Sequence, residues 1–514
     1  MRKSNAGKYF LLILMVVGIS FGVSADRETP VTITLLHLND VHGNVDEGIG
    51  YGKITALVNN FREENPNTLL FDAGDSFHGH PIATHSQGER IAQLHNAMGF
   101  DVMTPGNHDF NYGWQRLLEL GQMLEYPMLS ANVTKDGKPL FEESMIFTLE
   151  DVRIGVFGLS TPDTTTQTHP KNVEGLEFGL PLERAKEIAS QLRKKVDVLI
   201  VLGHLGSSSE SPFSSLEVIE HVPGIDIFID GHSHTAYSEG RLVGETLLVS
   251  SGSHCSHLGV VELVVENGVI QSKTARLIGK TDPLIGVVEE DEPVGGLVRE
   301  FAKEVELLGD EVVGEAKIRL DGDRQQVRRG ETNLGNLVTD AMRASTGADI
   351  GFLIGGSIRS SIEIGPITKD AVSKALPFDD RIQVKSLTGE GVLAILEHGL
   401  RYYPHENGAF PQVSGLNITF NEKALPGERV VDVQVNGQPL DPKGHYTVAT
   451  SDFLAAGGDG FTQLKDSRTL AEGMLVSEAF AWHIKQLPEV APIPEGRILP
   501  VIKVSLVLAP FFRK

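Results

Sequence analysis

The chain of 514 residues alternates short apolar runs with polar motifs that begin where the runs stop. Runs at 31–38, 68–71, 196–202 and 225–229 have the length and apolar content of strands buried in a parallel sheet. Because reactive groups in open α/β sheets gather beyond the carboxyl ends of the strands, the polar side chains that follow should lie together. Seven of them are potential metal ligands: Asp40, His42, Asp75, Asn107, His204, His232 and His234.

Predicted helices separate the apolar runs along the first half of the chain. Helical stretches at 51–64, 88–98 and 182–195 alternate with the runs, so residues 31–265 should form a layered α/β domain. Since 514 residues exceed what one ordinary core holds, at least one further domain is expected. A helix at 332–345, followed by short strands and glycine turns, should open it.

Between the two domains the sequence predicts a connecting helix. Residues 281–292 are acidic and contain proline, and Pro293 suits the first turn of a helix. Apolar residues then recur at three- and four-residue spacing: Val294, Leu297, Phe301, Val305 and Leu308. The alternative is a helix that simply packs on one domain. We therefore divide the chain into a first domain (26–285), a linker helix (286–310) and a smaller second domain (311–514).

The segment 1–25 is typical of a signal peptide. It has a basic start, an apolar core at 10–17 that is too short to span a bilayer, and small residues at 23–25 for cleavage. The single cysteine, Cys255, allows no internal disulfide and is expected to be a packed thiol. The apolar tail at 504–512 is expected to be a terminal strand. We expect a periplasmic or secreted protein without a transmembrane span in the mature chain.

The charge of the chain limits its partners. The formal net charge is -23, and loss of three basic residues with the signal peptide would make it about -26. Such a surface repels polyanions at long range, so a nucleic-acid polymer is not expected to bind. A small phosphate ester remains compatible, because local metal cations override the global charge.

Asp, Asn and His together form a mixed shell of oxygen and nitrogen ligands. That shell suits two divalent ions, zinc or manganese, and disfavours calcium or an iron–sulfur centre. Two such ions roughly 3.5–4 Å apart can lower the pKa of a bridging water that attacks phosphorus. Asp75 is the natural bridging carboxylate, and His108, which the ligand set does not need, is free to support the leaving oxygen. Each motif alone could be structural; the complete set favours a metal site.

These motifs, in this order, resemble the metallophosphoesterase domain of the 5'-nucleotidase family. The resemblance covers about 31–500 and extends to the second domain through the motifs at 331–337, 355–359, 376–378, 414–416 and 452–460. It implies a four-layer metallophosphoesterase-type α/β catalytic domain joined by a helix to a smaller α/β substrate-binding domain. It also implies the division of metal ligands: one ion on Asp40, His42, Asp75 and His234, the other on Asp75, Asn107, His204 and His232.

The resemblance also implies roles for residues that handle the substrate. His108 matches the catalytic histidine, and Phe378 and Phe453 match aromatics that sandwich the nucleobase. Without the resemblance, core packing would be the better interpretation of the two phenylalanines. Further matches bind the phosphate or ribose: Arg328, Arg359 and Asp459.

The sequence departs from the family pattern at three positions. Asn111 stands where many members have an aspartate that orients the catalytic histidine, and asparagine cannot stabilise an imidazolium by charge. His108 is therefore expected to act mainly as a neutral donor. Ile354 and Ala456 replace common asparagines near the substrate, so we expect the base or sugar to be read loosely.

The expected function is an exported two-metal phosphohydrolase that releases phosphate from nucleoside 5'-monophosphates, with UDP-sugars and nucleoside di- and triphosphates as further substrates. The protein should be a monomer or weak dimer. One alternative is a 2',3'-cyclic-nucleotide 2'-phosphodiesterase/3'-nucleotidase, which Asn111 favours. The alternative from another class is a nucleotide-binding protein without catalysis. The intact ligand set disfavours it, because a pure binder needs neither a bridging carboxylate nor a spare histidine.

Overall fold

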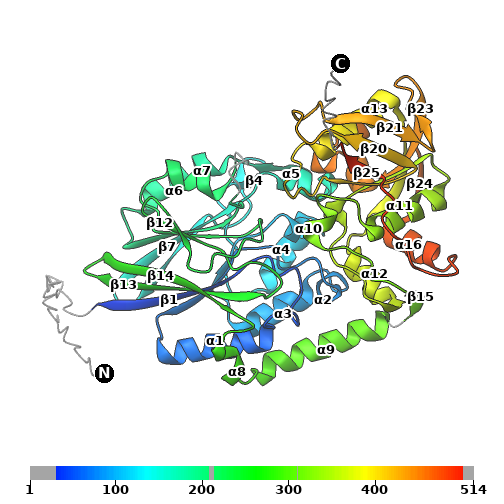
Figure 1. The fold of residues 1–514 in the computed structure, drawn as a ribbon. Coiled ribbons are helices and arrows are strands. Elements are labelled where there is room, and N and C mark those ends of the chain that lie inside the picture. Colours follow the sequence, from blue (N-terminus) through cyan, green and yellow to red (C-terminus); the bar gives the residue numbers. More distant parts are fainter. Residues whose placement is uncertain (1–29, 208–212, 310, 502–514) are drawn as a thin grey trace, which may run out of the picture.

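The computed structural model describes residues 30–207, 213–309 and 311–501, which form two α/β domains connected by one long helix (Figure 1). The predicted signal peptide and the apolar tail lie outside the described residues. Among the residues that the structure describes, no helix is long and apolar enough to cross a membrane.

Two large mixed sheets form the centre of the first domain. In spatial order, the first consists of β14 (Val269–Gly279), β13 (His257–Glu266), β1 (Val31–Leu38), β2 (Thr68–Asp72) and β3 (Val102–Met103). The second consists of β11 (Arg241–Val243), β12 (Thr246–Val249), β10 (Ile227–Asp230), β9 (Val198–His204), β7 (Val152–Ser160) and β6 (Ser144–Leu149). The strands that precede the candidate ligands are parallel in each sheet: β1, β2 and β3 in the first, β9 and β10 in the second.

The two sheets pack on each other and helices cover their outer faces. Ile33 and Leu35 of β1 share one buried core with Ile200 of β9 and Ile229 of β10. The outer helices on the first sheet are α1 (Tyr51–Glu64), α3 (Glu89–Met98) and α4 (Trp114–Met123), and those on the second are α6 (Pro181–Leu192) and α7 (Ser215–His221). This order of helix, sheet, sheet and helix confirms the expected four-layer domain.

Short elements complete the first domain around the ends of its strands. The helical ones are α2 (Pro81–Thr84), η1 (His108–Phe110), α5 (Thr164–Gln167), η2 (Pro170–Val173) and α8 (Pro283–Val287). A small sheet contains β5 (Lys138–Pro139), β4 (Val133–Lys135) and β8 (Leu176–Phe178). Of these, η1, α5 and η2 carry residues that matter for the site.

The second domain is smaller and has its own core. Its main sheet is β19 (Pro411–Ser414), β16 (Ile350–Ile354), β23 (His445–Ser451), β18 (Arg381–Thr388) and β24 (Arg468–Leu475). Two smaller sheets are β22 (Gln438–Pro439), β21 (Val430–Val435), β20 (Leu416–Phe420) and β25 (Ile498–Pro500), and β15 (Val312–Ala316) with β17 (Gly365–Thr368). The helical elements are α10 (Arg324–Val327), α11 (Asn333–Thr346), η3 (Gly355–Ser357), α12 (Lys369–Ala375), α13 (Gly389–Leu400), α14 (Asp452–Ala455), η4 (Gly458–Gly460), α15 (Thr462–Lys465) and α16 (Val476–Ile484).

The connecting helix is α9 (Glu292–Gly309), which runs along the lower edge of the molecule in Figure 1. Asp291 Oδ1 accepts a hydrogen bond from the backbone N–H of Val294 (3.0 Å) and so satisfies one donor of its first turn. Val294 and Phe301 are buried in the core of the first domain, and α9 also contacts α12 of the second. The helix therefore packs on the first domain and also leads into the second. It has features of both interpretations of the sequence, a connecting helix and a helix packed on one domain.

Two apolar side chains on α9 differ in burial, so their truncation should affect stability to different extents. Phe301 is 7% exposed and lies under the guanidinium of Arg90, whereas Leu307 is 70% exposed. Phe301→Ala should lower the free energy of unfolding of the first domain by about 3 kcal/mol, since it leaves a cavity in a packed core. Leu307→Ala should change it by less than about 0.5 kcal/mol. Chemical denaturation measures both, and equal effects would mean that α9 does not depend on this packing.

Candidate active site

All seven predicted ligands lie at strand ends or in the loops that follow them. Asp40 and His42 follow β1, Asp75 follows β2, Asn107 precedes η1, and His204 is the last residue of β9. His232 and His234 follow β10. Five of the seven adopt a left-handed backbone with positive φ, which is uncommon for residues other than glycine. These are Asp40 (51°), His42 (52°), Asp75 (60°), His232 (76°) and His234 (56°).

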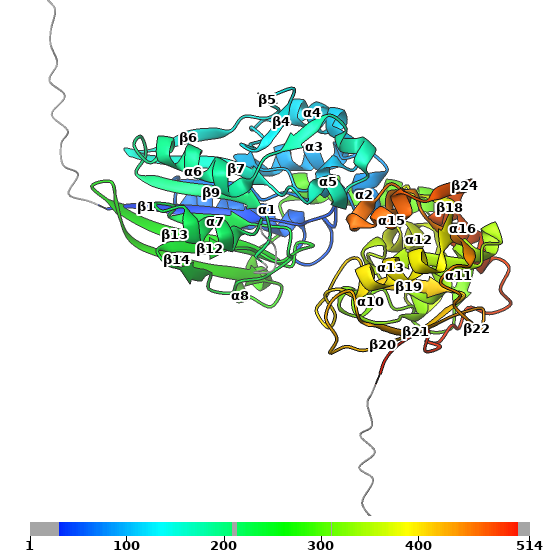
Figure 2. The ribbon, with the colours of Figure 1, turned by 90° about the horizontal axis from the view of Figure 1, so that it is seen from above.

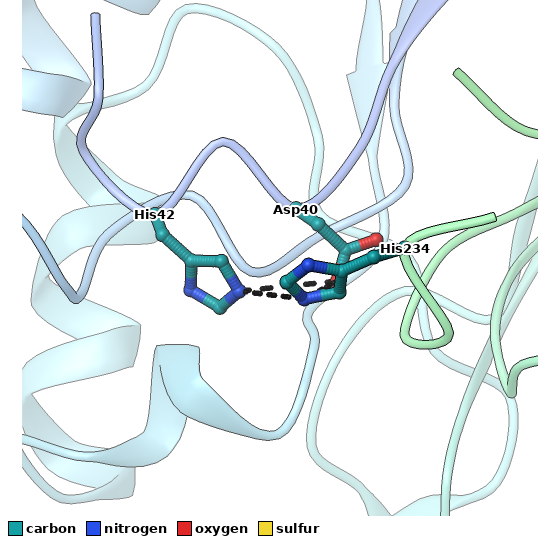
Figure 3. Close-up of side chains that lie close together, drawn as sticks. All are labelled: Asp40, His42 and His234. Carbon is teal, nitrogen blue, oxygen red and sulfur yellow. Dashed lines mark hydrogen bonds and ion pairs between the residues drawn. The ribbon is translucent and has the colours of Figure 1, made fainter. Parts of the chain in front are cut away.

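The loops bring the seven side chains into one cluster. His42 Nε2 lies 3.2 Å from His234 Nε2, and His234 Nε2 lies 3.4 Å from Asp40 Oδ1, as Figure 3 shows. Asp75 Oδ2 lies 3.3 Å from His204 Nε2 and 3.7 Å from His42 Nε2, so its carboxylate reaches both halves of the cluster.

The second half of the cluster contains the remaining candidates. Asn107 Oδ1 lies 2.9 Å from His232 Nδ1, and the rings of His232 and His204 are 5.2 Å apart. Ligand atoms in two groups lie within 4.8 Å of one another: Asp40, His42 and His234 in one group, Asp40, Asp75 and His204 in the other. Asp40 thus belongs to both groups, and Asp75, a member of the second group, also lies close to His42 of the first.

The chemistry of His204 indicates that this cluster needs a cation. Its Nδ1–H donates to the carbonyl of Ala73 (2.6 Å), so Nε2 is the ring nitrogen that faces the carboxylate of Asp75. Nε2 is buried and has no hydrogen-bond partner among the described residues. Burial alone would lower the pKa of His204, but Asp75 and Asp40 outweigh it and raise the pKa to about 10. With this pKa, a proton on Nε2 balances the two carboxylates when no ion is bound, and a divalent ion between Nε2 and Asp75 would take the place of that proton.

His42 repeats the arrangement in the other half. Its Nδ1–H donates to the carbonyl of His78 (3.2 Å), and its Nε2 faces the Nε2 of His234. Burial raises the pKa of Asp75, but the imidazole of His204 outweighs burial and holds this pKa well below its usual range, so the carboxylate is charged. The donor set therefore fits a pair of divalent ions.

Buried polar residues that the sequence analysis missed hold the ligand loops. Asp109 accepts four backbone hydrogen bonds of 2.8–2.9 Å, from Gly106 and from 75–77, and so ties the Asp75 loop to the Asn107 loop. Asn39 donates to Asp40 Oδ2 (2.8 Å) and accepts from the backbone of Ser251 (2.7 Å). Asp109 stands beside His108 in the same motif, but its contacts depend on two loops that are distant in sequence.

His108 and Asn111 lie beside the metal-ligand cluster. Asn111 Nδ2 donates to His108 Nδ1 (3.0 Å), so the two side chains form a hydrogen-bonded pair. Burial lowers the pKa of His108 well below its usual range, Asp75 opposes this and Arg359 adds to it, so the ring is neutral near pH 7. The backbone N–H of His108 donates to Asp75 Oδ1 (2.8 Å) and fixes its distance from the cluster.

The second domain lies directly against this cluster. The two domains enclose a cavity of about 840 Å³, and both the ligand loops and the second-domain candidates line it. Arg359 Nη2 lies 3.4 Å from His42 Nε2, and its guanidinium lies 5.8 Å from the ring centroid of Phe378. The other candidates that line the cavity are Arg328, Phe453 and Asp459.

Two further residues at this cavity were absent from the sequence-based set. Arg324 lines it from α10, one helical turn before Arg328, and this four-residue spacing is a signal that could have revealed it. His78 stacks on Phe378 across the domain boundary, with ring centroids 5.2 Å apart. Phe378 thus packs against first-domain histidines, while Phe453 covers the backbone of Gly458.

Comparisons with known proteins agree with this arrangement. The sequence model of the calcineurin-like phosphoesterase family matches residues 33–236, and that of the 5'-nucleotidase C-terminal domain matches residues 312–466. A 5'-nucleotidase precursor from Thermus thermophilus has 31% sequence identity and a TM-score of 0.82, covering 91% of this chain and 99% of that chain. The sulfate thiohydrolase SoxB of the same genus shares the fold at 21% identity and a TM-score of 0.76, over 91% of this chain and 96% of that chain.

Curated relatives extend the match. The trifunctional nucleotide phosphoesterase YfkN of Bacillus subtilis is 32% identical over 91% of this chain, and the chain spans only 35% of that relative's length. A 5'-nucleotidase of Diplobatis ommata is 28% identical over 95% of this chain and 94% of its own length.

Fold and site together define a metallophosphoesterase, a class of hydrolase that uses divalent metals. Within this class, the chain belongs to the 5'-nucleotidase family, whose members hydrolyse phosphoesters of nucleotides.

The contacts of Asp109 lead to a prediction about the loops. Asp109→Ala leaves four backbone N–H groups of two ligand loops without their acceptor, so the free energy of unfolding should fall by about 3 kcal/mol or more. Affinity for a divalent ion, measured by calorimetry, should fall as well. Glu63→Ala, which removes an exposed acid on α1, is the matched control and should change neither quantity. An Asp109→Ala protein that is as stable as the parent would contradict this account of the loops.

Proposed function

We propose that the chain removes phosphate from nucleoside 5'-monophosphates with two divalent ions, zinc or manganese, held by the seven clustered residues. The observation that carries the proposal is the cavity in which this cluster meets the arginines and aromatic residues of the second domain. Asp75 and Asp40 supply the charge for the ions, and Arg359 reaches the same point from the other domain. In the proposed reaction, a hydroxide derived from water attacks phosphorus. The bond that breaks is the one between phosphorus and the ribose 5'-oxygen.

Different residues of the chain have different roles in the proposed reaction. Two divalent ions held by Asp40, His42, Asp75, Asn107, His204, His232 and His234 would lower the pKa of a coordinated water and stabilise the developing charge. Arg359, Arg328 and Arg324 hold the phosphate oxygens with permanently charged, planar donors. His108, beside Asp75, donates a hydrogen bond to the phosphate or to the leaving oxygen.

The nucleoside part of the substrate belongs to the second domain in this proposal. The rings of Phe378 and Phe453 stack on the base, and Asp459 contacts the ribose. Burial raises the pKa of Asp459 to about 6. UDP-sugars and nucleoside di- and triphosphates are further substrates of the same cavity, because its volume of about 840 Å³ exceeds the needs of a monophosphate.

We also propose that the protein is exported and acts in the periplasm or outside the cell, after removal of residues 1–25. The division into a catalytic domain (26–285), a linker helix (286–310) and a substrate-binding domain (311–514) is supported by the position of α9 and by separate cores on either side of it.

A second candidate function is hydrolysis of 2',3'-cyclic nucleotides followed by release of the 3'-phosphate. The observation that favours it is the hydrogen bond between Asn111 and His108, because an amide stands where the resembled nucleotidases have a carboxylate. The Bacillus subtilis relative is named a trifunctional nucleotide phosphoesterase, which is compatible with more than one nucleotide substrate.

Product release from AMP, UDP-glucose and 2',3'-cyclic AMP tests the proposal. With manganese or zinc the protein should release phosphate from AMP, and chelation should abolish the release. Asp75→Asn should lower kcat by about a hundredfold or more, since it removes the carboxylate that reaches both halves of the cluster. Asp46→Asn, an exposed acid near the same loops, is the control. Turnover of the cyclic substrate alone would favour the second candidate, and turnover of none would contradict both.

The role of Phe453 has a separate test. Phe453→Ala should raise KM for AMP by about tenfold, because one face of the base loses its stacking partner. Activity on a small aryl phosphate should change little, since that substrate has no base. Phe453→Tyr keeps the ring and should keep the KM for AMP. Equal losses on both substrates would mean that Phe453 is a structural residue of the second domain.

A further inference from the structure

The loop after β7 approaches the catalytic pair from the domain boundary. It contains α5 and η2, and α5 contacts η4 of the second domain. Figure 2 shows α5 on the side of the first domain that faces the second. Thr168 lies between the two short helices and is 1% exposed. Its backbone N–H donates to the carbonyl of Thr164 (3.2 Å), so the position of Thr168 is fixed by the last turn of α5.

A chain of hydrogen bonds runs from this loop to His108. Thr168 Oγ1 donates to Asn111 Oδ1 (2.7 Å), and Asn111 Nδ2 donates to His108 Nδ1 (3.0 Å). Asn172 of η2 donates through Nδ2 to the backbone carbonyl of Asn111 (2.7 Å). Both the side chain and the main chain of Asn111 are therefore held by one loop.

The direction of these bonds decides which nitrogen of His108 carries a proton. In this arrangement Asn111 Oδ1 accepts from the Thr168 hydroxyl, and the amide NH₂ group faces the imidazole. His108 Nδ1 then accepts, and a neutral imidazole with an accepting Nδ1 has its proton on Nε2. Nε2 is the ring nitrogen left for the cavity that His108 lines.

We propose that Thr168 is a positioning residue, whose hydroxyl orients the amide of Asn111 and thereby keeps the His108 proton on Nε2. The inference rests on the proposed function, in which His108 donates to the substrate. An Nε2–H donates a hydrogen bond to a phosphoryl or leaving oxygen without prior protonation of the ring. No carboxylate is then needed beside His108, which explains how Asn111 serves at this position.

A carboxylate at position 111 should have the opposite effect on the His108 ring. In Asn111→Asp the new side chain only accepts hydrogen bonds, so both Thr168 Oγ1 and His108 Nδ1 must donate to it. The proton of a neutral His108 would move to Nδ1 and leave Nε2 without one. This variant reverses the tautomer while it keeps the size of the side chain.

Nitrogen-15 NMR of histidine-labelled full-length protein tests the tautomer without any substrate. Comparison with a His108→Gln sample assigns the ring signals. The parent protein should show a bare Nδ1 and a protonated Nε2 in His108, and Asn111→Asp should show the reverse. A protonated Nδ1 in the parent protein would overturn the proposal. This outcome does not depend on which nucleotide is hydrolysed, so it is distinct from failure of the proposed function.

Kinetics test the part played by Thr168. Thr168→Val should lower kcat about fivefold, the effect of losing one hydrogen bond of about 1 kcal/mol, with KM unchanged. Thr168→Ser keeps the hydroxyl and should restore kcat. The control is Thr165→Val, because Thr165 is exposed and its hydroxyl donates to the nearby carbonyl of Pro162, away from Asn111. Equal kcat for the Thr168→Val and parent proteins, or a Thr168→Ser protein as slow as Thr168→Val, would overturn the proposal.

Discussion

Two buried carboxylates that face the nitrogens of imidazole rings are the constraint on which the rest of this structure depends. Asp75 Oδ2 lies 3.3 Å from His204 Nε2, while the other nitrogen of that ring is committed to a backbone carbonyl. Such an arrangement is unfavourable without positive charge between the acceptors. The strained backbone of the ligand loops and the buried polar residues around them make sense as the means of holding acceptors together until a cation binds.

The second domain adds the opposite charge from across the cavity. Arg359 reaches within 3.4 Å of His42, and Arg324 and Arg328 line the same space. The chain as a whole has a net charge of -23, so this cluster of arginines is a local exception to an acidic protein. A small anion is therefore attracted only once it enters the cavity, where the two domains contribute ligands of different kinds.

The ends of the predicted strands were sufficient to predict a layered α/β domain and the clustering of the candidate ligands, whereas the four layers were implied only by the family resemblance. Asp40, Asp75 and His204 each follow an apolar run, and parallel strands bring their carboxyl ends together. The roles of Asp109 and Thr168 could not be predicted, because their partners lie 34 and 57 residues away in the chain. Arg324 was missed for a different reason: its four-residue spacing from Arg328 places both on one face of a helical turn, but this spacing alone does not distinguish a substrate ligand from a surface arginine.

The central claim is that the acceptor cluster holds two divalent ions with Asp75 between them. Diffraction from crystals grown with manganese, recorded at a wavelength where manganese scatters anomalously, tests it most directly. The account predicts two anomalous peaks roughly 3.5–4 Å apart. One should lie beside Asp40, His42 and His234, and the other beside Asn107, His204 and His232. A single peak, or a pair that does not involve Asp75, would contradict it.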